Sequence, residues 1–144
     1  MKRLREPLVY LAIDPGEKRT GWCGFKATGE LVGMGVITGT DKFLDALEDL
    51  PKEELKEVVI EQYKNRGGAV NFMSTMPTSQ HIGAITRILR KAGVEYVFQD
   101  PNPGLAIGLR FLRLYDTYQG KHVPDEVSAW AHGTYRLKST GVLK

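Results

Sequence analysis

The sequence predicts an α/β domain, in which a mixed five-stranded sheet carries helices on its faces. Two observations favour this class. Three strand-like runs open the chain, and helical and strand-like patterns alternate after them. A chain of 144 residues, 42% of them hydrophobic, suits one globular unit with a single core. We therefore expect one domain over residues 1–144.

The first half of the chain alternates apolar runs with turn residues. The run at 8–13 is almost continuously apolar, which is typical of a strand buried on both faces, and Asp14-Pro15-Gly16 ends it. Apolar residues at helical spacing follow at 42–50, up to Pro51. We expect, in chain order, strands at 8–13, 20–26 and 31–37, a helix at 42–50 and a strand at 57–61.

The second half contains fewer strand-like runs. A glycine pair and the lack of a clear period predict a loop at 64–77. Gly93 is a typical helix stop, and Pro124 suits the first turn of a helix, where its missing N–H costs nothing. We expect a helix at 79–92, a strand at 95–98, a turn at 100–104, an ambiguous segment at 105–115 that is compatible with a short helix, and a helix at 124–137.

Charge is unevenly distributed along the chain. The net charge is +3, but residues 41–57 carry seven acidic residues and three lysines, so the rest of the chain carries +7. A basic remainder beside one acidic segment suits a polyanionic partner such as nucleic acid. A solubilising surface without any partner would show the same excess.

The sequence lacks the features of membrane and disulfide-rich proteins. No stretch approaches about 18 consecutive apolar residues, and the charged N-terminus lacks the apolar core of a signal peptide. The single cysteine, Cys23, excludes an internal disulfide and a cysteine-rich zinc site. We expect a cytoplasmic protein, in the host cytoplasm if its source is viral, with no membrane partner.

Three acidic residues stand where expected buried elements end or begin. Asp14 follows the first strand, Glu61 ends the strand at 57–61, and Asp125 lies in the first turn of the last helix. If the two strands are neighbours, Asp14 and Glu61 emerge together at the sheet edge where α/β proteins bind ligands. Close carboxylates repel unless a cation neutralises them, and Mg²⁺ prefers such ligands. Two such ions can clamp the attacking and leaving oxygens of a phosphodiester.

Each acid alone also suits a structural role, in a turn, at a strand end or at a helix N-terminus. His122, three residues before Asp125, is a candidate ligand or proton carrier. We assign structural roles to His81 and His132. His132 is seven residues beyond Asp125, about 10 Å along the helix axis, which is too far to hold the same ion.

Three motifs follow one another along the chain, at residues 12–22 (AIDPGEKRTGW), 60–65 (IEQYKN) and 122–132 (HVPDEVSAWAH). In this order they resemble the motifs of the RuvC family of Holliday junction resolvases, which are nucleases with the ribonuclease H fold. The resemblance spans nearly the whole chain. Glu126 departs from the family pattern, in which alanine is common there, and could add a carboxylate.

The resemblance implies that Asp14, Glu61, His122 and Asp125 form a metal-binding catalytic set. It implies two Mg²⁺ ions, with Mn²⁺ as an alternative, and hydrolysis of phosphodiesters in four-way DNA junctions. His122 would ligate a metal or carry a proton to the leaving group. The resemblance also implies a homodimer whose two sites cut symmetric strands.

The resemblance further implies contacts with branched DNA. In this family an aromatic residue after the second acid inserts at the junction; Tyr63 matches it best, and Phe72 is the alternative. The candidate phosphate contacts, which position DNA without reading its sequence, are Lys18, Arg19, Lys64, Arg66, Arg110, Arg113 and Lys121.

Other functions remain compatible with the sequence. The segment from Asp14 to Gly21 also fits the opening of YqgF-like ribonucleases, which act on ribosomal RNA precursors. Forks and flaps are alternative DNA substrates. A catalytically inactive module that only binds branched DNA is the non-enzymatic alternative.

Overall fold

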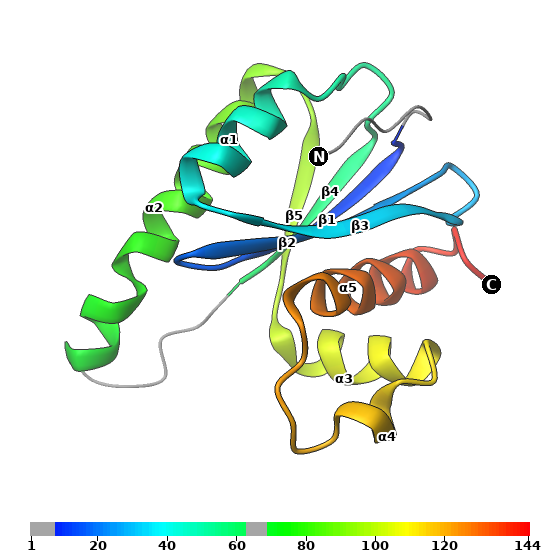
Figure 1. Ribbon diagram of the computed structural model, residues 1–144. Helices are drawn as coiled ribbons and strands as arrows, with labels where there is room; N and C mark the ends of the chain where they lie inside the picture. The colour runs from blue at the N-terminus through cyan, green and yellow to red at the C-terminus, as the bar shows by residue number, and fades with distance from the viewer. Residues whose placement is uncertain (1–7, 63–68) are drawn as a thin grey trace.

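The computed structural model describes residues 8–62 and 69–144, with residues 69–77 described by their backbone alone. A five-stranded sheet forms its centre, with the strands in the order β3-β2-β1-β4-β5 (Figure 1). The strands are β1 (Tyr10–Pro15), β2 (Arg19–Phe25), β3 (Leu31–Thr38), β4 (Glu57–Glu61) and β5 (Glu95–Gln99). The helices are α1 (Thr40–Asp49), α2 (Ala69–Lys91), α3 (Pro101–Phe111), α4 (Tyr115–Tyr118) and α5 (Asp125–Ser139).

The predicted mixed sheet is confirmed. β1, β2 and β3 pair antiparallel, whereas β4 and β5 extend the other side of β1 in parallel. The carboxyl ends of β1, β4 and β5 therefore meet at one edge of the sheet. In α/β proteins this is the edge at which ligands bind.

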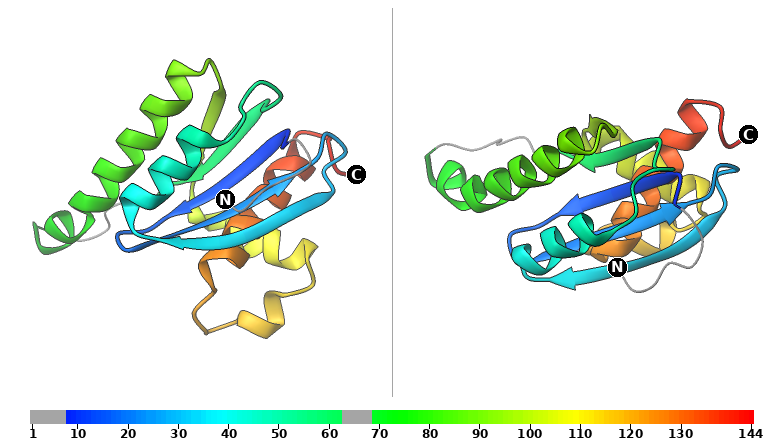
Figure 2. Two further views of the ribbon diagram at one scale, coloured as in Figure 1. Left: turned by 45° about the horizontal axis from the view of Figure 1, so that its top comes forward. Right: turned by 90° about the horizontal axis from the view of Figure 1, so that it is seen from above.

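Helices cover both faces of the sheet (Figures 1 and 2). α1 and α2 pack on one face, where Ile13, Phe43 and Leu89 belong to one buried core. α5 packs on the other face over Ala12 and Val59, and α3 packs against α5. Among these helices, as far as the chain is described, none has the length and apolar character that a bilayer crossing requires.

The structure corrects the loop prediction and places the predicted turn. The sequence predicts a loop at 64–77, but α2 already begins at Ala69. The first half of α2 projects beyond the sheet (Figure 1), so it needs no apolar stripe and shows no helical period in the sequence. The turn predicted at 100–104 coincides with a break at the start of α3, where Asn102 has non-helical angles and the Asn102–Pro103 peptide bond is cis.

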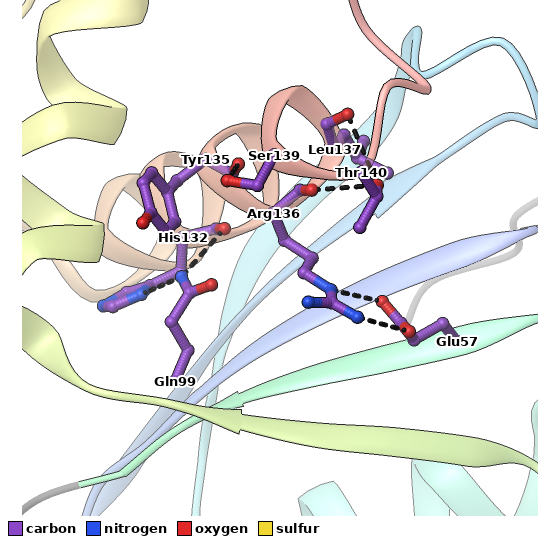
Figure 3. A network of polar contacts seen from close by, with 8 residues as sticks. All are labelled: Glu57, Gln99, His132, Tyr135, Arg136, Leu137, Ser139 and Thr140. Atoms are coloured by element: carbon purple, nitrogen blue, oxygen red, sulfur yellow. Dashed lines mark hydrogen bonds and ion pairs between the residues drawn. The ribbon is translucent and has the colours of Figure 1, made fainter.

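Contacts at both ends fix the position of α5 on the sheet. Near its first turn, a Cβ at Gly21 of β2 would overlap the backbone carbonyl of Asp125, so glycine lets the helix approach. Near its last turn, Arg136 forms a two-pronged ion pair with Glu57, with Nε–Oε1 at 2.8 Å and Nη2–Oε2 at 3.0 Å (Figure 3). Residues at the start of α5 are thereby held against the ligand-binding edge.

We expect Gly21→Ala to lower the free energy of unfolding by about 1–3 kcal/mol, because the new methyl group meets rigid backbone. Gly83→Ala is the matched control, because a Cβ at Gly83 of α2 would meet nothing within 4 Å. That change should stabilise the protein by about 0.5–1 kcal/mol through helix propensity. Urea unfolding of both variants measures the difference. Equal effects would contradict close packing of α5 on β2.

Candidate active site

Asp14 and Glu61 lie side by side at the carboxyl ends of β1 and β4. The parallel register pairs Ile13 with Ile60, so the acids that follow them are neighbours. Ile13 and Ile60 point into the core under α1 and α2. Since side chains alternate along a strand, Asp14 and Glu61 point to the other face, toward α5. The structure thus brings together two of the four predicted catalytic residues.

Both carboxyl groups are buried, with Asp14 6% and Glu61 2% exposed. Burial, a hydrogen bond with Glu61 and the charge of Glu61 raise the pKa of Asp14 to about 9. A hydrogen bond from Ser128 acts in the opposite direction. At neutral pH the pair therefore retains one proton, in the place where a cation could neutralise both groups.

Asp125 approaches this pair from the first turn of α5. Its charge contributes to the raised pKa of Asp14, although it is the smallest of the causes. The Asp125 side chain is 23% exposed, and Arg19 Nε lies 3.5 Å from its Oδ2. Arg19 itself is 59% exposed, so solvent weakens this ion pair. Asp125 is the outer and more accessible member of the three acids.

His122 is exposed in the segment between α4 and α5. In the part of the chain that the structure describes, no hydrogen bond or ion pair joins it to Asp14, Glu61 or Asp125. The structure therefore does not bring His122 into contact with the other predicted catalytic residues. Glu126, the next residue of the helix after Asp125, is partly buried.

One side of α5 carries a polar stripe that faces β4. Ser128, His132 and Arg136 recur every four residues, which places them on one side of the helix. Ser128 Oγ lies 3.4 Å from Glu61 Oε2, and His132 Nε2 lies 3.4 Å from Glu61 Oε1. The prediction for His132 considered only its distance from Asp125. It missed Glu61, because Asp125 packs over β2 and His132 over β4.

Gln99, at the end of β5, is a further site residue that the sequence reasoning missed. It pairs with Glu61 in the β4–β5 register and so points toward α5 as well. Its Nε2 lies 2.7 Å from His132 Nδ1 and 3.1 Å from the His132 carbonyl oxygen (Figure 3). The sequence could have indicated Gln99 by its position, because it is the last residue of its strand, as Glu61 is of β4.

His132 is uncharged at neutral pH. Burial lowers its pKa to about 4, against the charge of Asp14, which acts to raise it. Its contact with Glu61 is therefore not an ion pair. His81, in contrast, is far from the acids: it is buried in α2, forms a 2.9 Å hydrogen bond with Thr20 Oγ1, and has a pKa lowered by burial. This arrangement matches the predicted structural role of His81.

The predicted DNA contacts are scattered in the structure. Tyr63, Lys64 and Arg66 lie outside the described residues, as does the side chain of Phe72. Lys18 and Arg19 are exposed beside β1 and β2, and Lys121 is exposed next to His122. Arg110 and Arg113 are exposed at the end of α3, where Arg110 stacks 4.3 Å from the centre of the Tyr115 ring.

The Asp14–Glu61 pair fits a hard divalent cation. Carboxylate oxygens suit Mg²⁺ and Mn²⁺, and burial and the charge of Glu61 raise the pKa of Asp14, which a cation between the two groups would oppose. Among the described residues, no group of three or more His, Cys, Asp or Glu side chains is placed to hold a metal ion. One or two carboxylates are sufficient for Mg²⁺, because it usually keeps several waters and binds substrate phosphates.

No protein-family model and no curated protein matches this chain. Solved structures do match. The chain is similar to Thermus thermophilus RuvC in complex with a Holliday junction substrate, with a TM-score of 0.64 and 15% identity, covering 95% of this chain and 98% of that chain. The chain has the RuvC fold. A second T. thermophilus RuvC structure matches with a TM-score of 0.61 and 16% identity, covering 94% and 98% of the two chains. The ribonuclease H-like architecture implied by the sequence motifs is confirmed.

Cation-free protein should lose stability as the pH rises from about 5 to about 8. The pKa of Asp14 is about 9 in the folded state, against about 3.9 for an unfolded aspartate. The folded state therefore binds the additional proton in this window, and its stability decreases with pH by up to about 1.4 kcal/mol per unit.

Asp14→Asn should remove this pH dependence, and Asp45→Asn, at an exposed position of α1, should keep it. Chemical unfolding in EDTA at several pH values compares the three proteins. If wild type and Asp14→Asn differ by the same amount at every pH, the raised pKa of Asp14 is contradicted.

Proposed function

We propose that the protein is a metal-dependent endonuclease that resolves Holliday junctions by paired phosphodiester hydrolysis, with other branched DNA as related substrates. The observation that carries this proposal is the buried Asp14–Glu61 pair at the ligand-binding edge of the sheet, with Asp125 close by. The fold supports it, because a RuvC of the same fold is known in complex with a Holliday junction substrate.

In the proposed mechanism, Asp14 and Glu61 bind hard cations through their carboxylate oxygens. Mg²⁺ or Mn²⁺ held there would supply activation of a water molecule and neutralisation of phosphodiester charge, and two ions per site would suit this chemistry. Asp14 would give up its proton on cation binding beside Glu61. Asp125 adds a carboxylate from the more exposed side of the site. We assign to His122 the role of a ligand or of a proton carrier to the leaving oxygen.

Basic side chains supply the contacts with the DNA backbone in this proposal. Lys18 and Arg19 lie four and five residues after Asp14 in the chain, and Lys121 directly precedes His122. Basic residues therefore stand near the first and the last of the proposed catalytic motifs. Such contacts bind DNA by charge and position it without reading its sequence. The remaining members of the proposed surface are Lys64, Arg66, Arg110 and Arg113, with Tyr63 or Phe72 inserted at the junction. A homodimer would present two sites to symmetric strands.

A labelled synthetic four-way junction tests the proposal. Wild-type protein should introduce paired symmetric nicks only when Mg²⁺ or Mn²⁺ is present, and should leave a linear duplex of the same sequence intact. Asp14→Asn should reduce the cleavage rate more than about 100-fold, because it removes a metal ligand, while junction binding persists. Asp45→Asn should cleave like the wild type, because its side chain is exposed on α1.

The outcomes separate the alternatives. Junction binding without cleavage in either metal would contradict the nuclease proposal and indicate a binding module. Cleavage of RNA or of simple flaps in preference to the junction would keep the hydrolytic chemistry and overturn the proposed substrate. Cleavage by Asp14→Asn at the wild-type rate would show that the carboxylate pair is not the site.

A further inference from the structure

The side chains of Asp14, Glu61 and Gln99 form a row across three adjacent parallel strands, and the row points toward α5. The registers of β1 with β4 and of β4 with β5 align these three positions. Two members of the row are carboxyls, and the third is an amide, partly buried, that contacts His132. The acids already have a proposed role, whereas Gln99 and His132 do not.

The contacts of Gln99 determine which way its amide points. Nε2 lies 3.1 Å from the carbonyl oxygen of His132, and a carbonyl oxygen can only accept a hydrogen bond. The group at that position is therefore the NH₂ of the amide. Its second N–H donates to His132 Nδ1 at 2.7 Å. Nδ1 must then carry a lone pair, so the ring proton is on Nε2.

The N–H on Nε2 of His132 lies close to Glu61 without a well-formed hydrogen bond. The imidazole is 0% exposed, and Nε2 has no hydrogen-bond partner among the described residues. Glu61 Oε1, at 3.4 Å, is the acceptor next to it. An unpaired buried donor is costly, and a carboxylate is a strong acceptor, so a small movement of Glu61 toward the ring is favourable.

Gly104 of α3 covers the contact between Gln99 and His132. A Cβ at this position would lie 2.7 Å from Gln99 Nε2 and 2.9 Å from His132 Nδ1. Only glycine leaves room for the two side chains to meet in a buried position. The arrangement thus involves residues of β4, β5, α3 and α5.

We propose that Gln99 and His132 are positioning residues, which hold Oε1 of Glu61, so that Oε2, 3.4 Å from Ser128 Oγ, is the oxygen that binds the cation. His132 is then not a ligand, because Gln99 occupies the lone pair of Nδ1 and Nε2 carries the proton. This inference rests on the proposed cation site of the nuclease. The proposal states which atom donates and which accepts in each contact from Gln99 to Glu61. If these side chains only filled space, the direction of the hydrogen bonds would not matter.

Nitrogen NMR of the wild-type protein, free of metal, tests the assigned proton position directly. His132 should show an unprotonated Nδ1 and a protonated Nε2. A protonated Nδ1 would overturn the proposal without any variant being needed.

Mn²⁺ binding without DNA, measured by calorimetry, tests the effect on the cation site. Gln99→Glu keeps the side-chain shape but replaces the donor by an acceptor, so His132 should move its proton to Nδ1 and turn a lone pair toward Glu61. We expect the Mn²⁺ affinity to fall about 10-fold to 100-fold. The added negative charge alone would raise the affinity, so the two explanations predict opposite signs.

Gly104→Ala should weaken Mn²⁺ binding in the same direction without a change of charge, because it separates Gln99 from His132. Gln80→Glu and Gly83→Ala, both on α2, are the matched controls and should bind Mn²⁺ like the wild type. Unchanged or tighter binding by Gln99→Glu, or no Mn²⁺ binding by the wild type, would overturn the inference. Normal Mn²⁺ behaviour without junction cleavage would instead overturn only the nuclease proposal.

Discussion

Two carboxyl groups are buried side by side at the ends of β1 and β4. The site must neutralise their charge, by a proton or by a cation. Repulsion and loss of solvent oppose ionising both Asp14 and Glu61, so the pair keeps a proton far above the usual range. The side chains of α5 that contact the pair, Ser128 and His132, are uncharged at neutral pH. Full ionisation of the pair therefore needs a cation from solution. A buried acid pair of this kind reduces stability, and its retention is understandable where cation binding is the function.

One side of α5 packs tightly on β2, and the adjacent side forms polar contacts with β4. The side with Asp125 lies against Gly21, where even a single methyl group would not fit. The side with Ser128, His132 and Arg136 faces the two glutamates at the ends of β4, so donors meet acceptors along the strand. Close packing brings this polar side within reach of Glu61, and the Arg136–Glu57 pair prevents the helix from sliding along the sheet.

The pairing of Asp14 with Glu61 could be predicted because it depends on a short-range pattern. Each acid directly follows a continuous apolar strand, and two parallel neighbours place such residues together. The contacts of His132 could not be predicted in the same way. They depend on which side of α5 faces β4, and the close approach of α5 to Gly21 of β2 helps to set this orientation. The sequence spacing from Asp125 carries no information about β4.

The start of α2 illustrates a second limit. Residues before 79 show no apolar stripe because that half of the helix extends past the sheet, and amphipathic periodicity reports only on helices that bury one side (Figure 1). The predicted turn at 100–104 corresponds to the break at Asn102, but the sequence did not predict that α3 already begins at Pro101. Pro101 stops strands and starts helices equally well, so the residue type alone does not separate the two.

The decreasing burial of the acids indicates how a substrate reaches them in the proposed function. Asp14 and Glu61 are enclosed between the sheet and α5, whereas Asp125 is partly exposed and His122 is exposed. In the proposed function, a phosphodiester would approach from the side of Asp125, the most exposed of the three acids. Arg19 Nε lies 3.5 Å from the Asp125 carboxylate. Because this ion pair is exposed, replacing Arg19 by another cation requires little free energy. A cation that binds Asp125 would therefore release the guanidinium of Arg19 next to the position where the phosphate would arrive.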